Sequence, residues 1–378
     1  MEFGLSDDQE VLQRSARELL AAECPPAVVR HAVESTDGVS TALEQKLAEM
    51  GWTGVLVPTA HGGLGLSVFE AVLLAIEIGR HAAPGPFLFS SVLATAAITA
   101  AGNRAQKKRW LPQLASGERT ATVALFEEDD RLDPAGVRCG ARRSGSGHRL
   151  RGRKLFVPYA ASADWIVVAA RSSGKDGEAG VSLFLVDREA PGISIEPLAS
   201  FDRTRRFYEL TFRDVDVPAD HTLGRIGAAW STIARLHDLG ALVLAADGLG
   251  GSERVLEMAV AYSKTREQFG RAIGSFQAIK HIAAEMVADI EPARSLVWYA
   301  GYAQGASARE AARAASMAKA SLSEIYARSA NRAVQMYGGI GFTWEHDIHF
   351  WFKRAKWNEL AFGDAAYHRE RVAALGRF

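Results

Sequence analysis

Residues 262–286 read YSKTREQFGRAIGSFQAIKHIAAEM and predict two helices joined by a turn. Apolar residues ahead of the turn follow the i, i+3, i+4, i+7 spacing of one helix face: Val255, Met258, Ala259 and Tyr262. A second stripe of the same kind follows the turn: Phe276, Ile279, Ala283 and Met286. Gly270 and Gly274 lie between the stripes, where the chain must reverse.

The turn carries side chains that suit a nucleotide. Arg266 can fork onto pyrophosphate oxygens, and the ring of Phe269 can cover an adenine. Gln268 adds an amide between them. The alternative is a helical hairpin with a surface arginine and a core phenylalanine. Because loop composition is weak evidence, the residues alone leave both interpretations open.

The segment YSKTREQFGRAIGSFQ resembles the signature of acyl-CoA dehydrogenases, Y-x-x-x-R-x-Q-F-G-x-x-I-x-x-F-Q, which reaches across a subunit interface to the partner's FAD. A second segment, QMYGGIGF at 335–342, is similar to the family's Q-x-x-G-G-x-G, which contacts the adenosine half of FAD. The resemblance implies FAD as cofactor. The cofactor-binding candidates carried over by position are Arg266, Gln268, Phe269, Phe276, Gln277, Gln335, Gly338 and Gly339.

The chain changes character twice along its length. Residues 1–117 and 227–378 carry helical patterns, and residues 118–226 carry short runs of β-branched and aromatic residues that predict a barrel or a sandwich. The resemblance covers nearly the whole chain. It implies an α+β multidomain fold with an N-terminal α-helical domain, a central β-barrel and a C-terminal four-helix bundle.

Composition excludes some classes of function. Lys plus Arg and Asp plus Glu both number 44, so no net charge favours nucleic acid or a membrane surface. No apolar run approaches the about 20 residues that span a bilayer, and the N-terminus lacks the pattern of a signal peptide. Cys24 and Cys139 have no metal-ligand spacing and predict reduced thiols in a cytoplasmic protein.

The reaction that the resemblance implies is α,β-dehydrogenation of an acyl-CoA thioester, in which a base removes the Cα proton and FAD takes a hydride. The family's glutamate commonly lies in a C-terminal loop, where this chain has Phe362. Some relatives keep the base at the position of Gly240. Asp247, about two helical turns later, matches the place of a glutamate base in certain actinobacterial relatives. It is the candidate base, and a structural acid is the equal alternative.

The flavin side of the β segment departs from the family. The loop FEEDDRLDPAG keeps little beyond Glu127, and Phe156, Val157 and Pro158 replace the usual W-I-T. Proline lacks both the hydroxyl and the N–H that could bond the flavin. Three hypotheses follow: a catalytic acyl-CoA dehydrogenase, a non-catalytic FAD-site-completing subunit of a heteromeric dehydrogenase, and a flavin oxidase or N-hydroxylase. The implied partners are acyl-CoA, an electron-transfer acceptor and further chains of a homo- or hetero-tetramer.

An arginine-rich stretch, DRTRR at 202–206, offers a site for the phosphates of CoA. Its alternative is a solvated turn.

Overall fold

A computed structural model describes residues 4–376, so the ends of the first and last predicted segments, residues 1–3 and 377–378, lie outside the described residues. The first part of the chain is helical. Ser6 starts the first helix with a capping box, in which its hydroxyl and the Gln9 side chain bond each other's backbone N–H. The elements are α1 (Asp7–Glu23), α2 (Pro26–Glu34), α3 (Thr41–Glu49), α4 (Val68–Arg80), η3 (Leu88–Ala94), α5 (Thr95–Ala101) and α6 (Arg104–Ala115).

The middle part is one eight-stranded sheet in the order β6-β7-β3-β2-β4-β5-β8, with β1 paired in parallel to β4. Alternate side chains of its strands, such as Leu150, Phe184 and Leu210, form a buried core separate from the helical core. The strands are β1 (Ala121–Ala124), β2 (Gly140–Ser144), β3 (Gly147–Pro158), β4 (Trp165–Arg171), β5 (Val181–Asp187), β6 (Ile193–Leu198), β7 (Phe207–Val217) and β8 (Thr222–Leu223).

The last part is a bundle of helices, and its two longest helices span residues 230–265 and 308–337. Its helices are α7 (Trp230–Thr265), α8 (Gln277–Tyr302), α9 (Ala308–Tyr337), α10 (Ile348–Leu360) and α11 (Ala365–Gly376). Helix α7 also packs against α4, where Gly79 and Gly250 allow the two backbones to approach so closely that an added Cβ at either position would collide with the facing backbone. The N-terminal helices and the bundle therefore share one core.

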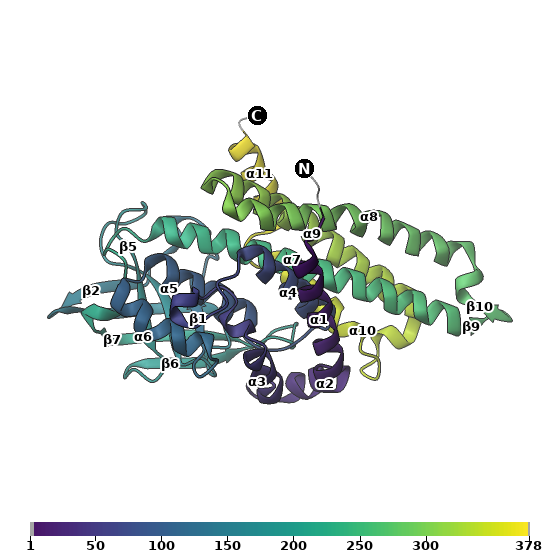
Figure 1. Ribbon diagram of the computed structural model, residues 1–378, viewed down its shortest axis with the longest axis horizontal. Coiled ribbons are helices and arrows are strands. Elements are labelled where there is room, and N and C mark those ends of the chain that lie inside the picture. The colour runs from purple at the N-terminus through teal and green to yellow at the C-terminus, as the bar shows by residue number, and fades with distance from the viewer. Residues whose placement is uncertain (1–3, 377–378) are drawn as a thin grey trace.

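The predicted turn between α7 and α8 is a β-hairpin, β9 (Glu267–Gln268) and β10 (Arg271–Ala272), and the sequence had indicated only a turn. Figure 1 shows this hairpin at one end of the molecule and the eight-stranded sheet at the opposite end. The long helices α7 and α8 carry it away from the sheet.

Among residues 4–376, no helix has both the length and the apolar composition of a bilayer-spanning segment.

Candidate functional site

Two tyrosines hold the two sequence motifs together at the end of the bundle. The ring of Tyr262, near the end of α7, stacks on that of Tyr337, at the end of α9, with centroids 4.3 Å apart. The Tyr337 hydroxyl donates a hydrogen bond of 3.0 Å to the Met258 carbonyl. Both tyrosines belong to the motifs that the sequence singled out, and their contact brings the hairpin and the twin glycines to the same end of the bundle.

The hairpin presents its side chains to solvent. Phe269 is 92% exposed, so it is not a core phenylalanine, and its ring meets Phe276 edge-on at 6.0 Å. The Arg271 guanidinium covers the ring of Phe276 at 4.2 Å from its centroid. Arg266 is exposed, and within the described residues its guanidinium makes no ion pair. A ring that is 92% exposed is accessible to a ligand or a partner chain.

The glycines of both motifs leave open space beside the backbone. A Cβ added at Gly270, Gly338 or Gly339 would meet no atom within 4 Å, and Gly338 has a φ of +66°. Gln335 and Gln277 are exposed nearby on α9 and α8. A free guanidinium, amides, an aromatic ring and uncovered backbone are the groups that bind a pyrophosphate and an adenine. This end of the chain therefore fits the adenosine half of FAD.

The flavin-side residues lie elsewhere, around a cavity of about 190 Å³ between the sheet and the bundle. This volume is below the about 300–1,000 Å³ of common ligand sites. The Pro158 carbonyl is already engaged by the Thr122 hydroxyl at 2.5 Å. The lining is almost wholly apolar, with Asp130 as its one ionisable side chain: Phe89, Val123, Phe126, Asp130, Phe156, Pro158, Trp357, Leu360, Ala361 and Phe362.

An aromatic cluster fills two of the three positions that the resemblance gives for the base, those of Phe362 and Gly240. The ring of Phe362 packs against Gly240 so closely that a Cβ at residue 240 would collide with it. Phe126 meets Phe362 edge-on at 5.0 Å and stacks on His237 at 5.6 Å. Burial lowers the pKa of His237 to about 3, so this imidazole is neutral. Neither of these two positions carries a carboxylate, as the sequence indicated.

The loop that carries Phe362 is held by residues that the sequence did not reveal. His368 hydrogen-bonds the Phe362 carbonyl at 2.9 Å. The Lys319 ammonium donates 2.8 Å bonds to the carbonyls of Asn358 and Gly363 and to the Ser323 hydroxyl. Burial lowers the pKa of Lys319 to about 7. A lysine among the alanines of α9 gives no local pattern, so only the folded contacts identify its role.

Asp247 lies in a fully buried charge network. Its carboxylate accepts from Arg354 at 2.6 Å and from Asn358 at 2.7 Å, and it pairs with Arg205 at 2.9 Å. Burial alone would raise the pKa of Asp247, but the charges of Arg205 and Arg354 outweigh burial and lower the pKa to about 2. These contacts favour the structural alternative for Asp247. Its role as base stays a prediction, and the Asp247 side chain is fully buried.

The arginine-rich stretch is committed to protein contacts. Besides Arg205, Arg203 and Arg206 both donate to the Val33 carbonyl at the end of α2, at 2.8 and 2.9 Å. These bonds cap an exposed helix end, where cations are favoured. They leave little of the stretch for the phosphates of CoA.

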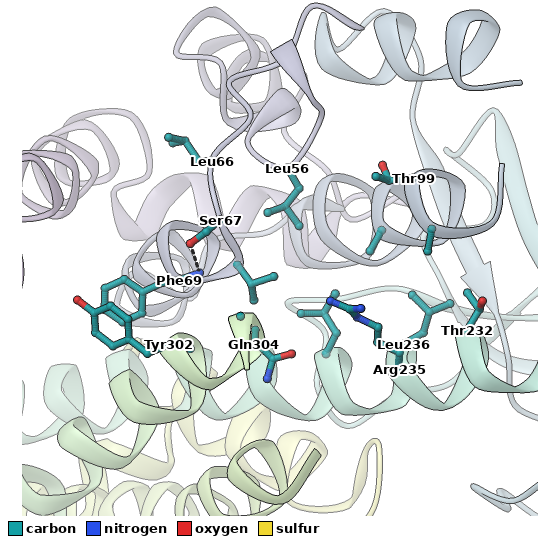
Figure 2. Close-up of a pocket in the computed structure, with 16 residues that line it drawn as sticks. Leu56, Leu66, Ser67, Phe69, Thr99, Thr232, Arg235, Leu236, Tyr302 and Gln304 are labelled. Atoms are coloured by element: carbon teal, nitrogen blue, oxygen red, sulfur yellow. Dashed lines mark hydrogen bonds between the residues drawn. The ribbon is translucent and has the colours of Figure 1, made fainter. Parts of the chain in front are cut away.

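A larger crevice of about 480 Å³ lies between α4, α5, α7 and the α8–α9 connection. Figure 2 shows Arg235 and Leu236 of α7 facing Thr99 across it, with the stacked rings of Phe69 and Tyr302 at one side. It shares no lining residue with the 190 Å³ cavity. The crevice is therefore separate from the flavin-side cavity.

Comparison with known proteins matches nearly the whole chain to the domains of one family. It matches the acyl-CoA dehydrogenase N-terminal domain over residues 6–118, the middle domain over 122–215 and the C-terminal domain over 230–375. It is 30% identical to an acyl-CoA dehydrogenase of Bacillus subtilis over 363 residues, which is 94% of each chain.

Two solved structures show the same fold. Butyryl-CoA dehydrogenase from Megasphaera elsdenii is 27% identical, with a TM-score of 0.92 over 100% of both chains. A chain of the ChsE4–ChsE5 complex from Mycobacterium tuberculosis is 29% identical, with a TM-score of 0.90 over 99% of this chain and 98% of that one.

The chain belongs to the acyl-CoA dehydrogenase family. The predicted three-part fold, the FAD cofactor and the acyl-CoA dehydrogenase activity are thereby confirmed. FAD supplies the hydride acceptor when bound. Members of the family bind acyl-CoA and pass electrons to an electron-transferring flavoprotein, and related chains form complexes.

Proposed function

We propose that this chain takes part in acyl-CoA dehydrogenation as one subunit of a heteromeric enzyme, in which it holds the adenosine half of FAD and completes the flavin site of a different chain. The observation that carries the proposal is the packing of Phe362 against Gly240, which fills two of the three positions that the resemblance gives for the base with one aromatic ring. A chain with this arrangement binds and orients the cofactor, and a partner chain supplies the base.

The contrast between the two ends of the chain supports this role. The hairpin and the twin glycines offer open backbone, a free Arg266 and an exposed Phe269. The cavity beside the sheet instead has Phe126, Phe156 and Pro158, and none of these side chains can donate a hydrogen bond to a flavin. The similar ChsE4–ChsE5 structure is a complex of two named chains, which gives a precedent for mixed assembly.

For Asp247 we propose a structural role. A carboxylate between two buried guanidinium groups has a pKa of about 2 and is a poor acceptor for the proton of a weak carbon acid. The charge network joins α7, α10 and the end of the stretch 202–206, so it holds the bundle to the sheet.

The test is the FAD content of the purified chain, alone and after mixing with acyl-CoA dehydrogenase chains that keep a glutamate in the C-terminal loop. We expect the chain alone to be colourless and inactive. With its partner we expect one FAD for each pair of chains, and bleaching of that flavin by an acyl-CoA. A yellow homo-oligomer with one FAD per chain that is bleached by acyl-CoA would overturn the proposal. Rapid peroxide formation by the reduced flavin would instead identify an oxidase.

A further inference from the structure

A cavity of about 670 Å³ lies on the N-terminal helical part, away from both regions described above. Its walls are α3, the loop 84–87, η3 and the connection from α6 to β1. The volume is within the about 300–1,000 Å³ of sites for small molecules. One wall, η3, is a π-helical segment of seven residues, a helix form found most often at functional sites.

The carboxylate of Glu44 in this cavity has one oxygen without a hydrogen-bond donor among the described residues. Glu44 Oε1 is buried, and within residues 4–376 it has no hydrogen-bond partner. It faces Gly85, where an added Cβ would be 3.4 Å from this oxygen. Leaving a buried carboxylate oxygen without a donor is costly, so the site lacks a group that donates.

Several other polar groups of the lining are already bonded within the protein. Ser90 accepts from the Ala121 N–H at 3.0 Å, and Arg119 pairs with Asp164 at 2.6 Å. Three hydroxyl groups of the lining donate to backbone carbonyls: Thr53 to Ala115, Ser116 to Gln113 and Thr120 to Ser162. These groups are therefore committed elsewhere, and no lining group bonds Glu44 Oε1 within residues 4–376.

The charge around Glu44 also favours a donor from outside. Burial and the nearby charge of Asp37 raise the pKa of Glu44 to about 7, which means that no cation of the chain neutralises it. A ligand that donates a hydrogen bond to Glu44 lowers the free-energy cost of burying its charge. A ligand that carries a carboxylate raises that cost. Much of the remaining surface is apolar, from Leu47, Pro86, Phe87 and Leu114.

We propose that this cavity binds an apolar small molecule that ends in a hydrogen-bond donor, a hydroxyl or a protonated amine, and that Glu44 receives the donor while Leu47, Phe87 and Leu114 cover the apolar part. The proposal does not depend on the subunit role inferred above, since the cavity lies within one chain. It assigns a binding site to the N-terminal helical part and no chemical step.

The test uses the full-length chain and three nine-carbon probes of equal length, nonylamine, nonan-1-ol and nonanoate. Binding is measured by titration calorimetry, with the intrinsic tryptophan fluorescence, to which Trp52 beside Phe87 contributes, as a second readout. At pH 8.5, where Glu44 is charged, we expect the amine or the alcohol to bind at least about tenfold more tightly than nonanoate, since a hydrogen bond to a charged group is worth about 1.5–3 kcal/mol. A stronger amine identifies an ammonium ligand, and a stronger alcohol identifies a hydroxyl ligand.

Glu44→Gln should reduce the preference for the amine or the alcohol over nonanoate by at least about tenfold. Glu23→Gln, at an exposed glutamate of α1, should leave this preference unchanged. If Glu44→Gln does not fold, Gln45→Trp at the exposed rim on α3 should weaken all binding by filling the mouth. Equal binding of the three probes, no binding, or the same preference in Glu44→Gln would overturn the proposal.

Discussion

The ring of Phe362 lies against the backbone of Gly240, and neither residue leaves room for the other to grow. Adding a methyl group in Gly240→Ala should destabilise the protein by about 1–3 kcal/mol, because the ring must move out of a packed cluster. Phe362→Ala alone should cost about 3–5 kcal/mol by leaving a cavity. The double variant should be more stable than the sum of the two costs predicts, and denaturant unfolding measures this coupling. Additive costs would mean that the two residues do not contact each other.

Asp247→Asn tests the structural role of the charge network. Removing the negative charge leaves Arg354 and Arg205 buried without a counterion, which should cost about 3–5 kcal/mol. Turnover per folded complex should stay near that of the wild type. Asp220→Asn, which breaks the exposed pair with Arg109, is the control and should cost under about 1 kcal/mol. Normal stability with turnover reduced a hundredfold or more would restore Asp247 as the base, given the usual contribution of about 10²–10⁴ from acid–base catalysis.

Lys319→Met should loosen the loop that carries Phe362. The ammonium bonds the carbonyls of Asn358 and Gly363, and methionine keeps the length of the side chain without a donor. Amide hydrogen exchange should rise in residues 359–364 more than in α9. Lys356→Met, which breaks only a partly exposed pair with Glu359, is the matched control. Equal exchange in both variants would show that the loop holds its position without Lys319.

Glu44 predicts a specific dependence of stability on pH. Its folded pKa of about 7 is above the unfolded value of 4.5, so the folded state binds more protons between these values. The contribution of Glu44 is most favourable below about pH 4.5 and is lost as the pH rises through about 7. Glu44→Gln should therefore stabilise the chain at pH 8, and the gain should shrink towards pH 5. Thermal unfolding of both proteins across this range is the measurement, and a gain independent of pH would contradict the raised pKa.

Arg266→Ala tests the cofactor-binding end. The side chain is exposed and makes no ion pair within the described residues, so its loss should leave the stability of the chain unchanged. FAD retention by the complex with the partner chain should fall at least about tenfold, because Arg binds pyrophosphate by charge-assisted bonds. Arg104→Ala, at an exposed arginine of α6, should retain FAD normally. Unchanged retention in Arg266→Ala would remove this residue from the FAD site.

The sequence predicted the features that depend on local pattern. The apolar stripes that include Tyr262 and Phe276 predicted α7 and α8. The alternation of apolar residues around Leu183 and Leu210 predicted strands, because both periods follow from local backbone geometry. The contact between Tyr262 and Tyr337 joins residues 75 positions apart and lay beyond any local pattern.

The contents of the charge network were also beyond the sequence. Asp247 could be recognised as a carboxylate in an apolar setting, but its partners Arg205 and Arg354 come from distant segments that only the fold brings together. Lys319 and Glu44 are surface residue types whose burial depends on packing. Such residues acquire their roles from tertiary neighbours.

The separation of the hairpin from the sheet along α7 and α8 has a consequence for how the protein acquires its flavin. A single molecule cannot contact both ends of one dinucleotide. We therefore expect FAD binding to follow second-order kinetics in protein concentration, because it requires two chains to associate. Dilution should then release FAD, and with it the yellow colour, as the chains dissociate. Added FAD should strengthen the association of the chains by mass action. Cellular flavin supply and the ratio of the two chains would together set how much working enzyme exists.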